Sequence, residues 1–139
     1  MNKILLSVAI CIFFVQFLYS GIMKIKKYPK KVKILKRKIN STAWSNIGMI
    51  CVILLEILAS LYLVFYLSIY PFIKKEKKNK KRNILRSLAI TCVVLFLIFM
   101  VTVSILYHPP AKTLIPFLSN LTTFGAFMII LGIVIQRDI

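Results

Sequence analysis

An apolar run from residue 47 to residue 70 constrains this chain most, because it is long enough to cross a lipid bilayer. About 20 apolar residues in a helix span a hydrocarbon core of about 30 Å. The run carries one acidic residue, Glu56, near its middle. A carboxylate at the bilayer centre costs on the order of 3 kcal/mol, so it needs a polar interior, a partner or a proton. Glu56 is therefore the first candidate for a functional residue.

Three further apolar runs of similar length indicate a multi-pass membrane protein. The chain has 139 residues, of which 60% are hydrophobic and 17% are charged, a composition typical of integral membrane proteins. We expect an all-α fold in which a four-transmembrane-helix bundle forms a single domain over residues 1–139. The predicted spans are residues 4–23, 47–70, 84–107 and 114–135.

The positive charge lies mainly in two connections, residues 24–45 and 71–83. It comes from 20 Lys and Arg residues against three acidic residues, which gives a net charge of +17. Such loops meet phospholipid headgroups. Nucleic-acid binding is disfavoured because no soluble folded unit carries these basic residues.

The first basic connection is predicted to contain a short amphipathic segment. Pro29 is suited to the start of a helix, and Val32, Leu35 and Ile39 then fall on one side of it, with lysines around the rest. One interpretation is a solvated basic loop with some interfacial helix. The other is a surface that holds anionic lipid headgroups or an acidic partner.

Four spans place both termini on the same side of the membrane. Basic residues near the span ends usually select the cytoplasmic side. Here the two sides share the 20 Lys and Arg residues equally, so the charge count does not select an orientation.

No complete catalytic set is visible in the sequence. The single histidine, His108, precedes two prolines, and the sequence has no HExxH motif, glycine-rich phosphate loop or Ser-His-acid pattern. The three cysteines lie one per apolar run without a CxxC motif, so we expect no metal site. We do not expect the chain to act as an enzyme on its own.

Small and polar residues are predicted to share faces of two spans. Gly48, Val52, Glu56 and Ser60 follow one another at intervals of four, while leucines occupy the other faces of that helix. This directs Glu56 toward neighbouring helices. In the last span, a second face made of Thr122, Gly125, Ile129 and Gly132 predicts close helix packing.

The candidate ligand-binding or polar-core residues are those whose polar groups can reach the bundle interior or its mouth. They are Glu56, Lys24, Tyr19, Asn120, Ser60 and His108. Lys24 also continues a polar stripe of the first helix that includes Gln16 and Ser20. The competing interpretation is that these groups only hold helices together, and that His108 is an ordinary helix-end residue.

The segment Ser20-Gly21-Ile22-Met23-Lys24, followed by Glu56 in the next helix, resembles the DoxX-like family of small four-helix membrane proteins. It is similar to that family's small-Gly-x-x-Lys signature at the end of the first helix. The resemblance implies a four-helix bundle, cytoplasmic termini, and association with quinone-linked or redox-associated membrane complexes. Ser60 departs from the family pattern, in which a glycine often follows the acidic residue, and both basic loops are unusually rich in lysine.

Two functional hypotheses follow. The first is an accessory or redox-associated membrane subunit whose polar site, centred on Glu56, binds a quinone-like ligand or carries a proton. The second is a non-catalytic membrane anchor or interaction protein, whose lysine-rich loops bind anionic lipids or acidic partners.

Overall fold

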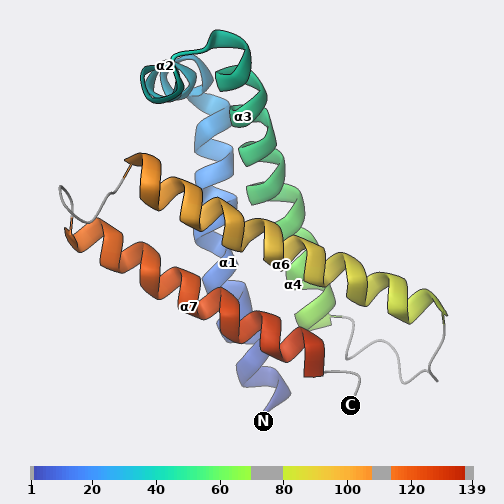
Figure 1. Cartoon of the computed structure of the whole chain (residues 1–139). Coiled ribbons are helices and arrows are strands. Elements are labelled where there is room, and N and C mark those ends of the chain that lie inside the picture. The colour runs from blue at the N-terminus through green and yellow to red at the C-terminus, as the bar shows by residue number, and fades with distance from the viewer. Residues whose placement is uncertain (1, 70–79, 108–113, 137–139) are drawn as a thin grey trace. The chain divides into compact units, whose positions relative to one another are not determined.

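The computed structural model describes residues 2–69, 80–107 and 114–136, and every element in these ranges is helical (Figure 1). Four helices are long and apolar enough to cross a membrane, and they comprise Lys3–Lys26, Thr42–Ile69, Arg82–Tyr107 and Leu114–Gln136. The predicted all-α fold with four spans is therefore confirmed, and the chain is a multi-pass helical membrane protein. The second span begins at Thr42, five residues before the predicted start.

The helices form two compact units, residues 1–76 and residues 77–139. Each unit contains two of the four candidate spans. The expectation that all four spans form one domain stays a prediction, and the two units are described separately below.

Unit 1 is a helical hairpin with a short helix inserted at its turn. Its second span is helical throughout and includes two π-helical turns, η1 and η2, at each of which the backbone makes one wider turn. The elements are α1 (Lys3–Lys26), α2 (Tyr28–Ile39), α3 (Thr42–Leu54), η1 (Leu55–Ala59), α4 (Ser60–Val64) and η2 (Phe65–Ile69). Helix α1 packs along α3, η1, α4 and η2 in turn.

The turn between α2 and α3 is built from two capping residues. Asn40 ends α2 in the left-handed conformation, at φ 58°, which asparagine tolerates better than most residues. Ser41 precedes α3, and its hydroxyl accepts a hydrogen bond from the backbone N–H of Trp44 at 3.4 Å. The two caps reverse the chain within two residues, so α2 folds back beside α3.

Helix α2 lies beside the end of α1 and the beginning of α3 (Figure 1). Gly21, five residues before the end of α1, meets Glu56 and Ile57, which lie about 20 Å of helix length into the second span. The second span therefore extends beyond α1 by about 13 Å, close to the diameter of one helix. The α2 helix occupies this offset and confirms the predicted amphipathic segment.

Unit 2 is an antiparallel pair, α6 (Lys80–Tyr107) and α7 (Leu114–Gln136). The Phe96 and Phe127 rings stack with centroids 4.8 Å apart, and both side chains are fully buried. Near the start of α6, the Arg86 guanidinium donates a hydrogen bond of 2.8 Å to the carbonyl oxygen of Ile135, near the end of α7. These contacts set the pairing of the two helices.

Candidate functional site

Lys24 of α1 and Glu56 of the second span form an ion pair in unit 1. The Nζ atom of Lys24 lies 2.8 Å from each carboxylate oxygen of Glu56, and it also donates to Ser20 Oγ at 2.6 Å. The Ser20 hydroxyl donates in turn to Glu56 Oε1 at 3.3 Å. Glu56 is only 2% exposed, so a buried carboxylate is held by one cation and one hydroxyl.

Glycine at position 21 allows the two helices to approach closely at this point. A Cβ atom on Gly21 would lie 2.7 Å from Ile57 Cγ1 and 3.3 Å from Glu56 Cβ. Ser20 and Lys24 are one helical turn apart and therefore lie on the same side of α1 as the contact. The short segment from Ser20 to Lys24 thus supplies the close contact, the hydroxyl and the cation together.

Lys24 turns inward rather than outward. It lies two residues before the end of α1, where a lysine side chain can extend to the water layer. Its ammonium group instead bonds Ser20, which is four residues nearer the middle of the helix, and Glu56. The carboxylate therefore draws a positive charge into the span, while the Lys24 side chain keeps 19% exposure.

Glu56 and Ser60 lie at the first π-helical turn of the second span. Such turns occur often at functional sites because they displace side chains from the regular helical face. Ser60 follows directly after η1 and is fully buried. Among residues 2–69, 80–107 and 114–136, its hydroxyl has no hydrogen-bond partner. A buried hydroxyl donor therefore lies one turn from the carboxylate.

The structure joins only part of the predicted site. Lys24 and Glu56 come together, and Ser60 is buried beside η1. Tyr19 is 66% exposed, and its neighbour Ser20 takes the position on α1 that faces Glu56, so a role for Tyr19 in the polar site stays a prediction. Asn120 belongs to unit 2, where its Nδ2 atom is buried with no partner among the described residues. His108 lies outside the described residues.

Ser20 was missing from the predicted set although it contacts both charged groups. The signal for it was present in the sequence, since Gln16, Ser20 and Lys24 form a stripe at intervals of four. Besides Lys24, one residue of this stripe contacts Glu56 in the structure, and that residue is Ser20. Gln16 is exposed, so the stripe did not itself identify which residue faces inward.

A smaller polar contact ties the other end of the same two spans. The Ser68 hydroxyl, in the second π-helical turn, donates to the Ser7 carbonyl oxygen at 3.4 Å, and the Ser7 hydroxyl donates to the Ser68 carbonyl oxygen at 3.5 Å. The Cys11 thiol lies 3.9 Å from the Ser68 hydroxyl. Each π-helical turn thus presents a polar side chain to α1.

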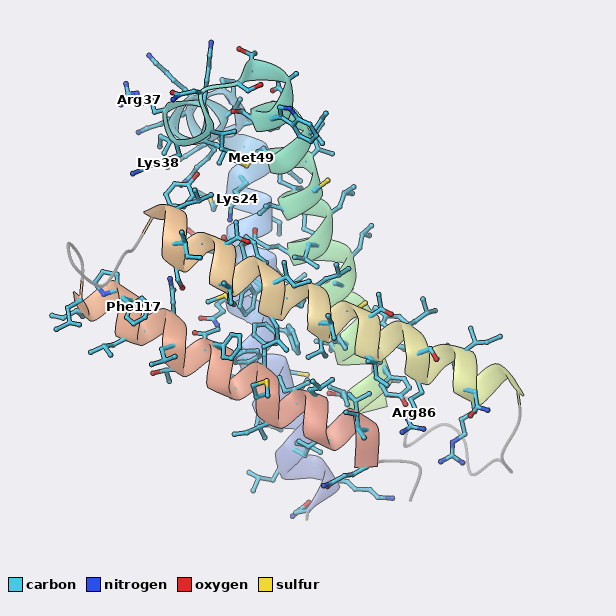
Figure 2. The ribbon with its side chains drawn as sticks, in the orientation of Figure 1. Lys24, Arg37, Lys38, Met49, Arg86 and Phe117 are labelled. Carbon is cyan, nitrogen blue, oxygen red and sulfur yellow. The ribbon has the colours of Figure 1, made fainter. Side chains whose placement is uncertain are left out.

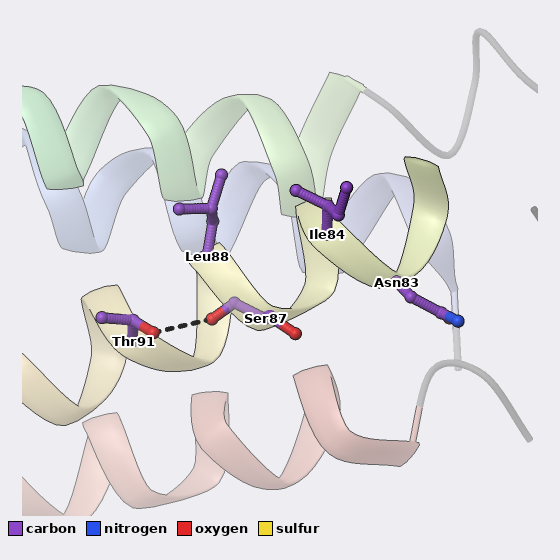
Figure 3. Close-up of a pocket in the computed structure, with 5 residues that line it drawn as sticks. All are labelled: Asn83, Ile84, Ser87, Leu88 and Thr91. Carbon is purple, nitrogen blue, oxygen red and sulfur yellow. Dashed lines mark hydrogen bonds between the residues drawn. The ribbon is translucent and has the colours of Figure 1, made fainter. Parts of the chain in front are cut away.

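A hollow of about 320 Å³ lies along α6, lined by Asn83, Ile84, Ser87, Leu88 and Thr91 (Figure 3). The Thr91 hydroxyl donates to the Ser87 carbonyl oxygen at 2.9 Å and is therefore already paired within the helix. No lining residue carries a charge, and this hollow lacks the converging polar groups of a binding site.

Comparisons with protein-family models, with curated proteins and with solved structures gave no match. Within the described residues, the cysteines are unpaired, and no three His, Cys, Asp or Glu side chains could hold a metal ion together. The Glu56 cluster is thus the site that the geometry itself distinguishes.

Proposed function

We propose that this multi-pass membrane protein is an accessory, DoxX-like subunit whose Glu56 site binds the polar head of a quinone-like ligand. The observation that carries the proposal is the inward turn of Lys24 to a buried carboxylate, within helices of membrane-spanning length. Ionisable residues inside such helices are rare, and they mark ligand or proton pathways when they occur. The proposal assigns binding to this chain and electron transfer to a partner in a redox complex.

The groups at the site match the chemistry of a quinone head. Its two carbonyl oxygens accept hydrogen bonds, and the site offers the Lys24 ammonium together with hydroxyl groups on Ser20 and Ser60. The Ser60 hydroxyl has no partner among the described residues, so it can bond a ligand without breaking an existing contact. The partial exposure of Lys24 gives one side from which the head can approach.

Glu56 adds a group that can hold a proton. When its carboxylate is ionised, Lys24 balances the charge; when it accepts a proton, Lys24 is released to donate to a ligand oxygen. Proton uptake and ligand binding are therefore linked through one ion pair. A site of this kind suits a ligand whose oxidation releases protons.

The resemblance to the DoxX-like family adds support from the same residues. The small residue, glycine and lysine of its signature correspond to Ser20, Gly21 and Lys24. Ser20 and Lys24 form hydrogen bonds with Glu56, and Gly21 lies where α1 approaches Glu56 closely. The cytoplasmic placement of both termini is part of this proposal.

A structural clamp between α1 and the second span is the second candidate function for this pair. It is favoured by the fact that Lys24 bonds both oxygens of Glu56, so the pair satisfies itself. Under this alternative, the chain is a non-catalytic membrane anchor.

Ligand titration separates the two functions. We would titrate the full-length protein in lipid nanodiscs with decylubiquinone and measure bound ligand by calorimetry. Lys24→Gln should weaken binding about tenfold or more, as expected for losing one charged hydrogen-bonding partner. Glu56→Gln imitates the protonated acid and releases Lys24, so this variant should bind the ligand at least as tightly as the wild type does. Lys26→Gln is the matched control, because Lys26 is an exposed lysine two residues further along α1.

Retained helix content in each variant, measured by circular dichroism, shows that the bundle has folded. If Lys24→Gln binds decylubiquinone as the wild type does, the quinone site is wrong. If the wild type does not bind decylubiquinone and the variants lose only stability, the pair is a clamp.

A further inference from the structure

We propose that α2 is a rigid cationic surface that binds the anionic headgroups of phospholipids at the end of unit 1. This inference concerns the turn of the hairpin and is independent of the Glu56 site. The helix contains six basic residues and no acidic one. What the structure adds to the sequence is the fixed position of this helix and the direction of its charges.

One side of α2 is anchored to α3. Leu35 is 7% exposed, and its Cδ2 atom would lie 3.6 Å from a Cβ built on Gly48, so the leucine fills the space above that glycine. The Tyr28 hydroxyl donates to Asn46 Oδ1 at 3.1 Å. Tyr28 and Leu35 are seven residues apart and lie on the same helical face. These two contacts hold α2 at its first residue and within its second half.

The opposite side of α2 carries exposed cations. Lys30, Lys33 and Arg37 recur at helical intervals of three and four, and all three are exposed. Because this face lies opposite the stripe that contains Tyr28 and Leu35, anchoring the helix directs these charges away from α3. Figure 2 shows the side chains of Arg37 and Lys38 extending from α2.

Aromatic residues place α2 at the level of the headgroups. Trp44, in the first turn of α3, is 67% exposed, and Tyr28 begins α2. Tryptophan and tyrosine prefer the boundary between hydrocarbon and water. Helix α2 fills the offset between the end of α1 and the start of α3, so it lies in this boundary layer. An amphipathic basic helix there meets lipid phosphates directly.

An anionic lipid fits this surface better than an acidic protein does. The three exposed cations follow a helix that is held beside the spans, where lipid headgroups are always present at high local concentration. Phosphate oxygens accept hydrogen bonds from both lysine and arginine. A protein partner would need apolar contacts as well, and Lys30, Lys33 and Arg37 supply only charge.

Fluorescence of Trp44, the single tryptophan of the chain, tests the proposal. We would reconstitute the full-length protein in nanodiscs of phosphatidylglycerol and phosphatidylcholine, with bromine on the upper acyl chain of one lipid at a time. Bromine quenches nearby tryptophan, so the ratio of quenching gives the relative association of the two lipids. We expect brominated phosphatidylglycerol to quench Trp44 more strongly, and we expect 0.5 M salt to remove most of the difference.

Substitutions locate the surface. Lys30→Gln, Lys33→Gln and Arg37→Gln together should lower the preference for phosphatidylglycerol by at least about fivefold, because the loss of even one basic residue near an anionic surface weakens binding by about that factor. All three are exposed, so the fold should be retained. Lys74→Gln, Lys75→Gln and Lys77→Gln remove the same charge from the other basic connection and should leave Trp44 quenching unchanged.

Equal quenching by the two lipids in the wild type would overturn the proposal, as would a preference that survives the triple substitution in α2. A third outcome would be that the wild type shows no lipid preference and binds an acidic protein that the variant Lys30→Gln, Lys33→Gln, Arg37→Gln does not bind. In that outcome the surface binds a protein, and the lipid assignment is wrong.

Discussion

The Nζ atom of Lys24 lies 2.8 Å from both carboxylate oxygens of Glu56, although Lys24 stands only two residues before the end of α1. A lysine near a helix end normally extends to water. The inward direction of this one shows that the carboxylate and the ammonium are positioned by each other. Each charge would be costly in the span without its partner.

Removing one charge of this pair should destabilise unit 1 more than removing both. Lys24→Met leaves the Glu56 carboxylate buried without its cation, and we expect a loss of about 3 kcal/mol in the free energy of unfolding. The double variant Lys24→Met with Glu56→Leu should recover most of that loss. Unfolding in mixed detergent micelles, followed by circular dichroism, measures both. Additive effects of the two single changes would contradict a direct interaction.

Gly21→Ala should separate α1 from the second span. The new Cβ would lie 2.7 Å from Ile57 Cγ1, so a helix or the Ile57 side chain must move, at a cost of about 1–3 kcal/mol. Gly125→Ala in α7 is the matched control, because a Cβ there meets no described atom within 4 Å. The same unfolding measurement compares them, and equal stabilities would show that the Gly21 contact tolerates a methyl group.

Leu35→Ala should loosen α2 from α3. Burial of a leucine side chain is worth about 2 kcal/mol or more, and the loss here falls on a 12-residue helix with few other anchors. We expect faster amide hydrogen exchange in Tyr28–Ile39, with little change in α1. Ile34→Ala, at a position that is 36% exposed, should have a smaller effect. If Leu35→Ala leaves the amide hydrogen exchange of α2 unchanged, Leu35 is not the residue that anchors α2 to α3.

Arg86→Met should weaken the end of α7. It removes the 2.8 Å bond from the guanidinium to the Ile135 carbonyl oxygen, a charge-assisted bond worth about 1.5–3 kcal/mol. The last turn of α7 should then exchange its amide hydrogens faster. Asn83→Ala, at an exposed position three residues earlier, serves as the control. Equal exchange in the two variants would show that the bond adds nothing.

The spans were predictable because length and hydropathy alone determine which helices can cross a bilayer. The second span was predicted too short, since its first turns, from Thr42 to Asn46, contain several polar residues. Those residues remain helical because Ser41 caps the turn and α2 packs beside it. Capping and packing of this kind do not appear in a hydropathy profile.

The Lys24–Glu56 contact was a candidate because a charge inside a span needs a partner. Its detail was not predictable, since the π-helical turns change the register of the second span and hydrophobic periodicity does not reveal them.

Within unit 2, α7 packs on α6 through a face other than the predicted one. Gly125 and Ile129 are exposed, and the buried face is formed by Phe127, Ile130 and Val134 instead. The stacking of Phe96 on Phe127 buries far more apolar surface than a glycine contact can. Small residues allow close approach, but they do not require it, so their spacing alone does not identify the packed face.

The ion pair in unit 1 also bears on how the protein is made. During synthesis Lys24 is added to the chain first, and Glu56 is added 32 residues later. The second span would enter the bilayer with an unneutralised acid, at a cost of about 3 kcal/mol, if α1 were not already beside it. The hairpin is thus the smallest part of the chain that can enter the membrane with both charges matched. The order of synthesis suits this pairing, because Lys24 is already in the membrane when Glu56 is inserted.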